Sequence, residues 1–338
     1  MTAGGRRADK DGCAVAAWLF ACAAFTFAMV VVGGITRLTE SGLSIVEWQP
    51  LLGAIPPLSQ ADWETLFAKY RETPQFRKVF SEIGLDGFKS IFWWEYAHRL
   101  LGRVIGLVFL IPFSYFYFRR KLSRRLTWKL AGIFALGALQ GAIGWYMVKS
   151  GLVDDPRVSH FRLTAHLGLA LIIFSFEFWL ALGLLKEKFR AKPDPFALLV
   201  VSAVLLMALS GGFVAGLRAG HAYNSFPLMN GHLVPPEAFM LEPWWHNFLW
   251  NVATVQLLHR ALFWLLLVLV PLLWWQARRT PAQLAAHHLL GMFLVQAVLG
   301  VATLLLAVPV ALGAAHQAGA VLLLAAALWT AQATQRSD

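Results

Sequence analysis

Charged residues are scarce in this sequence. Lys, Arg, Asp and Glu together make up 14% of the 338 residues, whereas 58% are hydrophobic, including 15 Trp and 25 Phe. A soluble domain of this size does not need so much apolar surface, and many of the apolar runs have the roughly 20 residues that a helix needs to cross a bilayer. The composition therefore excludes an ordinary soluble protein and predicts an all-α protein with several membrane spans.

Cysteine is nearly absent as well. Cys13 and Cys22 both lie at or inside the first apolar run, so no pair is available outside the membrane for a structural disulfide. The N-terminal stretch also shows no convincing small-residue cleavage site of a secretory signal. We therefore expect the run at about residues 14–35 to remain as the first span.

Most of the charge that is present is positive, with a formal net charge of +11. Because basic residues in short loops mark the cytoplasmic side of a membrane protein, their placement favours a membrane protein and argues against nucleic acid as a partner. It also predicts that the N- and C-termini lie in the cytoplasm. The basic residues form these groups: Arg6, Arg7 and Lys10; Arg119, Arg120, Lys121, Arg124 and Arg125; Lys186, Lys188, Arg190 and Lys192; Arg278 and Arg279.

Eight apolar runs are long enough to cross the membrane. We expect spans at about residues 14–35, 92–118, 127–148, 161–185, 195–217, 250–275, 284–306 and 311–331. With the basic loops inside, even-numbered spans run from the outer to the inner face. Long outer segments follow spans one and five. In the first of them, residues 61–70 have apolar side chains at helical spacing, which predicts an amphipathic helix on the membrane surface or, alternatively, a helix that caps the bundle.

The two parts of the chain repeat one another. The matching motifs are Gly33-Gly34 with Gly211-Gly212, His98-Arg99 with His259-Arg260, Gln140 with Gln296, and His166 with His316. Four spans per repeat preserve the orientation of each repeat in the membrane. We therefore expect two tandem four-helix bundles related by a pseudo-two-fold repeat, an N-terminal half at residues 1–190 and a C-terminal half at residues 191–338.

Four of the ten histidines lie near the starts of spans two, four, six and eight, at the outer face: His98, His166, His259 and His316. A histidine inside a membrane helix is costly without a partner. A single one more often makes an interhelical hydrogen bond than a metal bond. Two imidazoles at matched depth in each half, however, suit the two faces of a haem iron. The four residues are therefore predicted to be axial haem-iron ligands, one pair in each half.

The remaining histidines and other metals fit less well. Zinc or copper would want three or four ligands at one point, whereas each half offers two. Solvated loop positions in the outer segments, rather than an entrance, are the interpretation for His160, His221, His232 and His246. The cytoplasmic start of span seven excludes His287 and His288 as partners of the four.

Small and basic residues lie around the predicted ligands. Room for a flat macrocycle would come from Gly102, Gly106, Gly168 and Gly319. Guanidinium groups pair well with carboxylates, and haem propionates could emerge at the outer face. The arginines placed there are Arg99, Arg103, Arg162 and Arg260.

One difference between the halves points to chemistry. Glu95 stands three residues before His98, whereas Gln256 stands three residues before His259. This spacing puts Glu95 on the same helix face as its histidine. A carboxylate near a haem could shuttle protons or hold a substrate group, and the alternative is an interfacial glutamate that faces water. The difference favours the first half as the reactive one.

Two motifs and the four-histidine repeat resemble the haem A synthase family, in its proteobacterial and mitochondrial type. The motifs are G-G-I-T-R-L-T-E-S-G-L-S from Gly33 to Ser44 and E-Y-A-H-R from Glu95 to Arg99. The resemblance extends from the first span to the eighth. Gram-positive members carry a cysteine pair in the first outer segment, which this chain lacks, so a thiol-based redox step is not expected here.

The resemblance implies a function and a division of labour. The family oxidises the C8 methyl group of haem O by successive hydroxylations to give the formyl group of haem A for terminal oxidases. The chain would then be an oxidoreductase of a bacterial cytoplasmic (inner) membrane. His98 and His166 would hold haem O or its hydroxylated intermediate, with Glu95 taking part in catalysis. A permanent haem B would be held by His259 and His316.

The resemblance also implies partners and leaves alternatives. Haem O is the expected substrate, and a haem O synthase and an electron donor are expected partners; a homo-oligomer is left open. From the residues alone, a bis-histidine diheme electron carrier linked to a quinol would explain the four histidines, although not the difference between Glu95 and Gln256. A haem transporter or chaperone is a third candidate, which would hold its haem loosely and show no turnover.

Overall fold

The computed structural model describes residues 3–49, 52–151, 158–185 and 194–335. Within these residues the regular structure is helical, with one isolated β-bridge, and eight helices are long and apolar enough to cross a membrane. They are α1 (Ala3–Leu38), α4 (Leu85–Phe118), α5 (Arg124–Gly151), α6 (His160–Leu184), α7 (Pro195–Gly216), α9 (Val252–Ala277), α10 (Gln283–Leu305) and α11 (Val310–Ala333). The prediction of an all-α protein with eight spans is confirmed.

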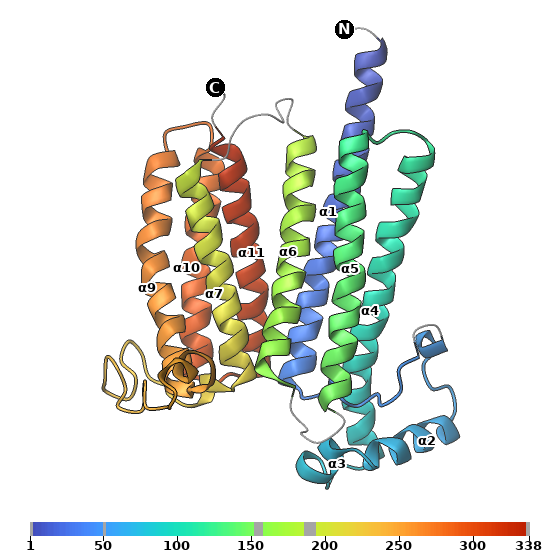
Figure 1. Cartoon of the computed structure of the whole chain (residues 1–338), viewed down its shortest axis with the longest axis vertical. Coiled ribbons are helices and arrows are strands. Elements are labelled where there is room, and N and C mark those ends of the chain that lie inside the picture. Colours follow the sequence, from blue (N-terminus) through green and yellow to red (C-terminus); the bar gives the residue numbers. More distant parts are fainter. Residues whose placement is uncertain (1–2, 50–51, 152–157, 186–193, 336–338) are drawn as a thin grey trace.

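The long helices form two neighbouring groups. Figure 1 shows α1, α4, α5 and α6 on one side of the molecule and α7, α9, α10 and α11 on the other. The first helix of each group joins them, because α1 packs on α4, α6 and also α11, while α7 packs on α9, α11 and also α6. The predicted boundary at residue 190 and the basic residues from Lys186 to Lys192 lie outside the described residues. The repeat itself stays a prediction.

The helix starts follow from local sequence. Asp194 caps α7 by accepting hydrogen bonds from the backbone of Phe196 and Ala197, and Pro195 supplies a first residue that needs no donor. Asn251 caps α9 in the same way. Figure 1 shows that α1 begins and α11 ends at one end of the bundle, opposite the segment with α2 and α3. This arrangement agrees with both termini on one side of the membrane.

The share of each helix that is buried within the protein differs among the helices of the first group. In α6, 56% of the most apolar window is buried within the protein, whereas the share is 11% for α4 and 6% for α5. Apolar side chains that the protein does not cover suit the lipid tails around a membrane helix. Helices α4 and α5 therefore lie at the periphery, and α6 lies at the centre of the molecule.

The first outer segment departs from the prediction. It contains α2 (Gln60–Arg71) and α3 (Pro74–Val79), and α4 starts at Leu85, about two turns before the predicted residue 92. The apolar face of α2 packs on this extension of α4, with ring centroids 5.2 Å apart for Tyr70 and Phe88. The expected helix is present, but protein covers its apolar face, so the capping alternative describes it better than a helix lying on lipid. This contact explains the early start of α4.

Aromatic packing fixes the outer segment on α4. Trp63 lies edge-on to Phe92 at 4.9 Å between centroids, and such pairs contribute about 0.5–1.5 kcal/mol each beyond the burial of their area. Burial also raises the pKa of Tyr70, whose hydroxyl donates to Gln75 Oε1 at 3.1 Å. The side chain therefore stays neutral. The outer segment is thus packed against the first turns of α4. Glu95 and His98 lie on the next turns of that helix.

Candidate functional site

Each half brings its two predicted ligands together. His98 of α4 lies close to His166 of α6, and His259 of α9 lies close to His316 of α11. All four residues are half-buried and lie on apolar helices. In the described part of the chain, no three His, Cys, Asp or Glu side chains cluster as a metal site would need. The histidines are therefore arranged in pairs.

In the first half, a glycine of a neighbouring helix lies against each ring. A Cβ added to Gly33 of α1 would lie 3.0 Å from Cε1 of His98, and one added to Gly144 of α5 would lie 2.9 Å from Cε1 of His166. Carbon atoms in contact prefer about 3.5–4.0 Å. A side chain at either position would therefore displace the histidine ring that the glycine contacts.

The second half has the same arrangement. A Cβ on Gly300 of α10 would lie 2.8 Å from Cε1 of His316, and one on Gly211 of α7 would lie 3.4 Å from Cε1 of His259. Gly300 corresponds to Gly144 in the sequence repeat, and Gly211 corresponds to Gly33. Matching glycines therefore position the matching histidines in both halves.

Two glutamines brace the histidine on the last helix of each half. Gln140 Nε2 donates to the backbone carbonyl of His166 at 3.0 Å, and Gln296 Nε2 donates to that of His316 at 2.9 Å. Each contact joins the third and fourth span of its half. The sequence comparison used these glutamines only as markers of the repeat, and their bracing contact was not anticipated.

The ring nitrogens test whether a haem would fit. The Nδ1 atoms of His166 and His316 are buried and have no hydrogen-bond partner among the described residues. Buried polar atoms are normally satisfied, so orphaned ones call for an explanation such as a ligand. Paired imidazoles framed by glycines, in apolar surroundings, fit the axial ligation of a haem in each half.

His259 differs from the other three histidines. Its Nδ1 lies 2.7 Å from the hydroxyl of Ser210, which also lies 2.7 Å from the carbonyl oxygen of Met207. Ser210 immediately precedes the Gly211 that packs on the same ring. The sequence analysis missed this serine; its position next to the Gly-Gly motif was the available signal.

The Glu95 carboxylate is buried and fully engaged. Oε2 accepts hydrogen bonds from the Ser44 hydroxyl and the Ile45 backbone N–H, each at 2.7 Å, and Oε1 accepts one from Arg99 Nη2 at 2.6 Å. Only 3% of the residue is exposed, so the alternative of a glutamate facing water is wrong. Three residues separate it from His98, which places the two on neighbouring turns of one helix face.

In the second half, Gln256 takes the place of Glu95. Its Nε2 donates to the carbonyl oxygen of Ala219 at 3.0 Å, and its Oε1 accepts from Arg260 at 3.5 Å. Both positions therefore tie the start of the histidine helix to an outer segment. Among the described residues, a buried carboxyl group beside a histidine pair is therefore found in the first half, next to His98.

The predicted propionate partners bind the outer segments. Arg99 donates to the carbonyl oxygens of Ile45 at 2.7 Å and Glu47 at 3.0 Å. Arg103 donates to the carbonyl of Gln49 at 2.9 Å. These contacts place both guanidinium groups at the outer end of the first half. Their pairing with propionates stays a prediction.

The arginine of the second half behaves alike. Arg260 donates to the carbonyls of Tyr223 at 2.8 Å and Ser225 at 2.9 Å. Arg162, on α6, lies 4.5 Å from the centroid of the Tyr146 ring, a cation–π contact. The basic residues are therefore at the predicted face, and three of the four hold the backbone of the outer segments.

The interpretation of His160 as a solvated residue is wrong. It is the first residue of α6, only 5% of it is exposed, and its ring lies 4.4 Å from that of Trp250 and 5.7 Å from that of Phe213. The span starts one residue earlier than predicted. Contacts with Trp250 and Phe213, which lie outside the first group of helices, bury His160. His221 and His232 are exposed, as predicted.

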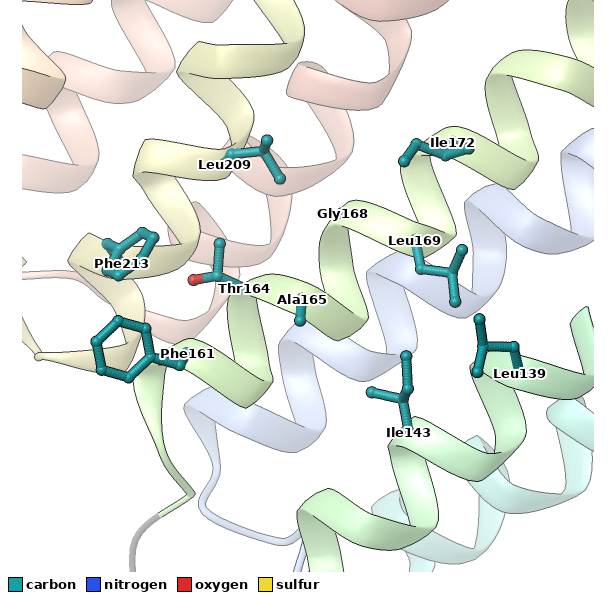
Figure 2. Close-up of a pocket in the computed structure, with 10 residues that line it drawn as sticks. All are labelled: Leu139, Ile143, Phe161, Thr164, Ala165, Gly168, Leu169, Ile172, Leu209 and Phe213. Atoms are coloured by element: carbon teal, nitrogen blue, oxygen red, sulfur yellow. The ribbon is translucent and has the colours of Figure 1, made fainter. Parts of the chain in front are cut away.

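Two apolar cavities lie between the long helices. The first, of about 410 Å³, lies between α5, α6 and α7, with Thr164, Ala165 and Gly168 in its wall (Figure 2). The second, of about 400 Å³, lies between α9 and α10, with Phe226 and Phe263 in its wall. None of their lining residues is titratable, so both cavities suit apolar groups.

Sequence reasoning also missed a buried acid inside the membrane. Glu177 of α6 is 1% exposed, and its Oε2 accepts a hydrogen bond from the Thr26 hydroxyl of α1 at 2.9 Å. It lies 11 residues beyond His166, about 16 Å along the helix axis. A lone glutamate within an apolar run was the available signal. The distance along α6 separates it from the histidine pair.

Comparison with known proteins agrees with this geometry. Residues 16–328 match the family of cytochrome oxidase assembly proteins (COX15-CtaA). The heme A synthase of Nitrosospira multiformis is 59% identical, with 93% of this chain and 92% of the relative covered. Those of Nitrosomonas eutropha (55% identical; 93% and 92% covered) and Parvibaculum lavamentivorans (46%; 96% and 95%) are also similar. The chain therefore belongs to the cytochrome oxidase assembly protein family, in which these relatives are heme A synthases.

Proposed function

We propose that the chain is a haem A synthase, an oxidoreductase that oxidises the C8 methyl group of haem O to a formyl group and so gives haem A for terminal oxidases. The observation that carries this proposal is the pairing of two histidines in each half, each ring set against a glycine. The relatives named heme A synthase align with more than nine-tenths of this chain.

The first half is proposed to hold the substrate, with His98 and His166 as its iron ligands. Haem O carries a long prenyl chain that haem B lacks, so its site needs more room. In the repeat, Gly102 and Gly137 of the first half correspond to Phe263 and Phe293 of the second. A Cβ on Gly137 would meet nothing within 4 Å.

The second half is proposed to hold a permanent haem B between His259 and His316. Phe263 and Phe293 stack across α9 and α10 with ring centroids 6.2 Å apart. In the first half, a Cβ on Gly102 would lie 3.2 Å from Cε of Met29, so only the position of Gly137 is open. A haem without a prenyl chain suits this half. The role of this haem would be to relay electrons from a donor to the first half.

The side chains around the substrate would act by position and charge. A bound haem supplies the redox chemistry of its iron. Glu95 carries the only buried carboxylate beside a histidine pair in the described part of the chain, and three donors hold its oxygens in place. We assign it the proton transfers that accompany oxidation. Arg99, Arg103 and Arg260 are the proposed partners of the haem propionates.

The surroundings follow from the same proposal. Arg119 and Arg125 lie at the end of the bundle where α1 begins, which favours cytoplasmic termini in a bacterial inner membrane. Haem O must come from a haem O synthase in the same membrane, and an electron donor must supply the second half. These are the partners that the proposed reaction requires.

The test is to identify the haems that the protein holds after turnover. The chain is co-expressed with a haem O-producing enzyme in a host without haem A, purified in detergent, and its extracted haems are identified by chromatography and mass. Haem B together with haem A or a hydroxylated haem O is expected. Haem B alone, with haem O untouched in the membrane, would instead favour the diheme electron carrier; loosely held haem without turnover would favour a haem chaperone.

A further inference from the structure

Ser210 links the Gly-Gly motif of α7 to one histidine of the second half. Its hydroxyl lies 2.7 Å from the carbonyl oxygen of Met207, one turn earlier on α7, and 2.7 Å from Nδ1 of His259 on α9. A carbonyl can only accept a hydrogen bond, so the single hydroxyl proton goes to Met207. The hydroxyl oxygen must then accept from His259, and Nδ1 of that ring carries a proton.

This contact sets the tautomer of the imidazole. A neutral histidine has one protonated nitrogen, so a proton on Nδ1 leaves the lone pair on Nε2. A histidine that binds a metal commonly donates its other N–H to a second group, which orients the ring and makes the ligand more basic. Ser210 is placed to do this for His259.

The first half lacks the matching group. Gly33 corresponds to Gly211, so the residue before it, Val32, corresponds to Ser210. Valine offers no oxygen to a ring nitrogen, and no hydrogen bond to the His98 ring occurs within the described residues. The two histidine pairs therefore differ at one hydroxyl, next to glycines that pack on equivalent rings.

We propose that Ser210 is a positioning residue that makes the second half a permanent haem site and the first half an exchangeable one. The proposal rests on the proposed haem B between His259 and His316. With its Nδ1–H bound to Ser210, His259 donates more electron density to iron, which favours the ferric state and lowers the midpoint potential. The haem is then held tightly and delivers electrons readily, whereas His98, without this support, can release substrate and product.

The test compares purified full-length variants by haem content and by the midpoint potential of the haem that remains. Ser210→Ala is expected to weaken haem retention about 10- to 100-fold, the usual cost of losing a partner of a metal-binding histidine. The remaining haem should show a raised midpoint potential and an altered low-spin ferric spectrum. Ser210→Thr, which keeps a hydroxyl, is expected to restore both properties towards wild type.

A matched control is available on α6. The Ser175 hydroxyl also donates to a backbone carbonyl, that of Leu171 at 2.7 Å. Ser175→Ala should therefore leave haem content and potential unchanged. Wild-type haem content and potential in Ser210→Ala would overturn the proposal, as would the same change in Ser175→Ala.

A second variant keeps the test decisive if Ser210→Ala does not fold. Val32→Ser adds the hydroxyl to the first half and is expected to slow the release of haem from that site; an unchanged release rate would contradict the proposal. His259→Ala distinguishes a failure of the haem B assignment from a failure of the role of Ser210. If that variant keeps its tightly bound haem, the assignment of haem B to the second half fails; if it loses haem while Ser210→Ala does not, only the role of Ser210 fails.

Discussion

Among single residues, Glu95 distinguishes the two halves most clearly. Its carboxylate is buried beside His98 and receives hydrogen bonds from Ser44, Ile45 and Arg99. Such a group could transfer protons, or it could simply fasten the outer segment to α4. The corresponding Gln256 fastens its own outer segment without a charge. A structural role alone therefore does not require the acid.

Glu95→Gln is expected to stop the conversion of haem O while leaving both haem sites filled. The amide keeps the shape and can still bind Arg99, but it cannot carry a proton at neutral pH. Acid–base groups typically contribute about 10²- to 10⁴-fold to a rate, so turnover should fall at least about 100-fold. The measurement is product formation per bound haem.

Ser44→Ala is the control for this prediction. It removes one hydrogen bond to the carboxylate at 2.7 Å but leaves its charge and its bond to Arg99. Turnover in Ser44→Ala should stay close to wild type if Glu95 acts as an acid or base. Equal losses in both variants, or full activity in Glu95→Gln, would show that Glu95 only holds the outer segment.

The glycines beside the histidines provide a second prediction. Gly144→Ala should displace the His166 ring and reduce haem binding in the first half, because its Cβ would lie 2.9 Å from that ring. Gly132→Ala is the control on the same helix, since its Cβ would meet nothing within 4 Å. Alanine is a better helix former than glycine by about 1 kcal/mol, so the control should be neutral or slightly stabilising. Equal haem content in the two variants would contradict the positioning role of Gly144.

Among the helices, the contrast between the α4–α5 pair and the α9–α10 pair carries the assignment of substrate. A Cβ on Gly137 would meet nothing within 4 Å, whereas the corresponding residue of the second half, Phe293, stacks on Phe263. Helix α5 is also the least buried of the eight long helices among the described residues. This contrast favours the first half for the proposed haem O, whose prenyl chain needs room, and the second half for the proposed haem B, which has no such chain.

Gly137→Phe is expected to reproduce the second-half packing in the first half. Its ring should occupy the open space beside Gly137, so haem O binding should weaken by at least about tenfold while the haem of the second half stays bound. Gly132→Phe, on the same helix and also in open space, serves as the matched control. The measurement is the ratio of haem O to haem B in the purified protein. An unchanged ratio in Gly137→Phe would remove the spatial argument for the first half.

The outer segments show what the sequence could and could not predict. The spacing of apolar residues predicted the helix now seen as α2. The lengths of the apolar runs predicted the eight spans. Contacts between distant residues, such as Tyr70 with Phe88 and His160 with Trp250, decided where α4 and α6 begin. Local patterns carry no information about such contacts, so the start of α4 and the burial of His160 were predicted wrongly.

The same limit applies within the site. Periodic placement and the repeat singled out four histidines, because depth in a membrane follows from counting residues along a helix; their role as haem ligands stays a prediction. The partners of Glu95 and the hydroxyl next to His259 depend on how loops and helices meet in three dimensions. Ser44 and Ser210 were therefore visible in the sequence but could not be assigned a role.

For the whole molecule, reciprocal contacts join the two groups of helices. Arg37, in the last turn of α1, donates to the carbonyl of Ala215 at 3.1 Å, and Arg218, after α7, pairs with Glu40. Gln317, next to His316, donates to the carbonyl of Val30 on α1 at 2.8 Å. Each half therefore supports the helix that positions a histidine in the other. The two groups of helices therefore form one compact unit with two unlike histidine pairs.

The most direct measurement is the haem inventory of four single variants, each purified after co-expression with a haem O-producing enzyme. His259→Ala and His316→Ala should lose haem B, because they remove the ligands of the permanent site. His98→Ala and His166→Ala should keep haem B and accumulate no haem A or hydroxylated haem O. If haem B instead disappears with His98 or His166, or if haem A still forms without them, the division of the protein into a substrate half and a haem B half is contradicted.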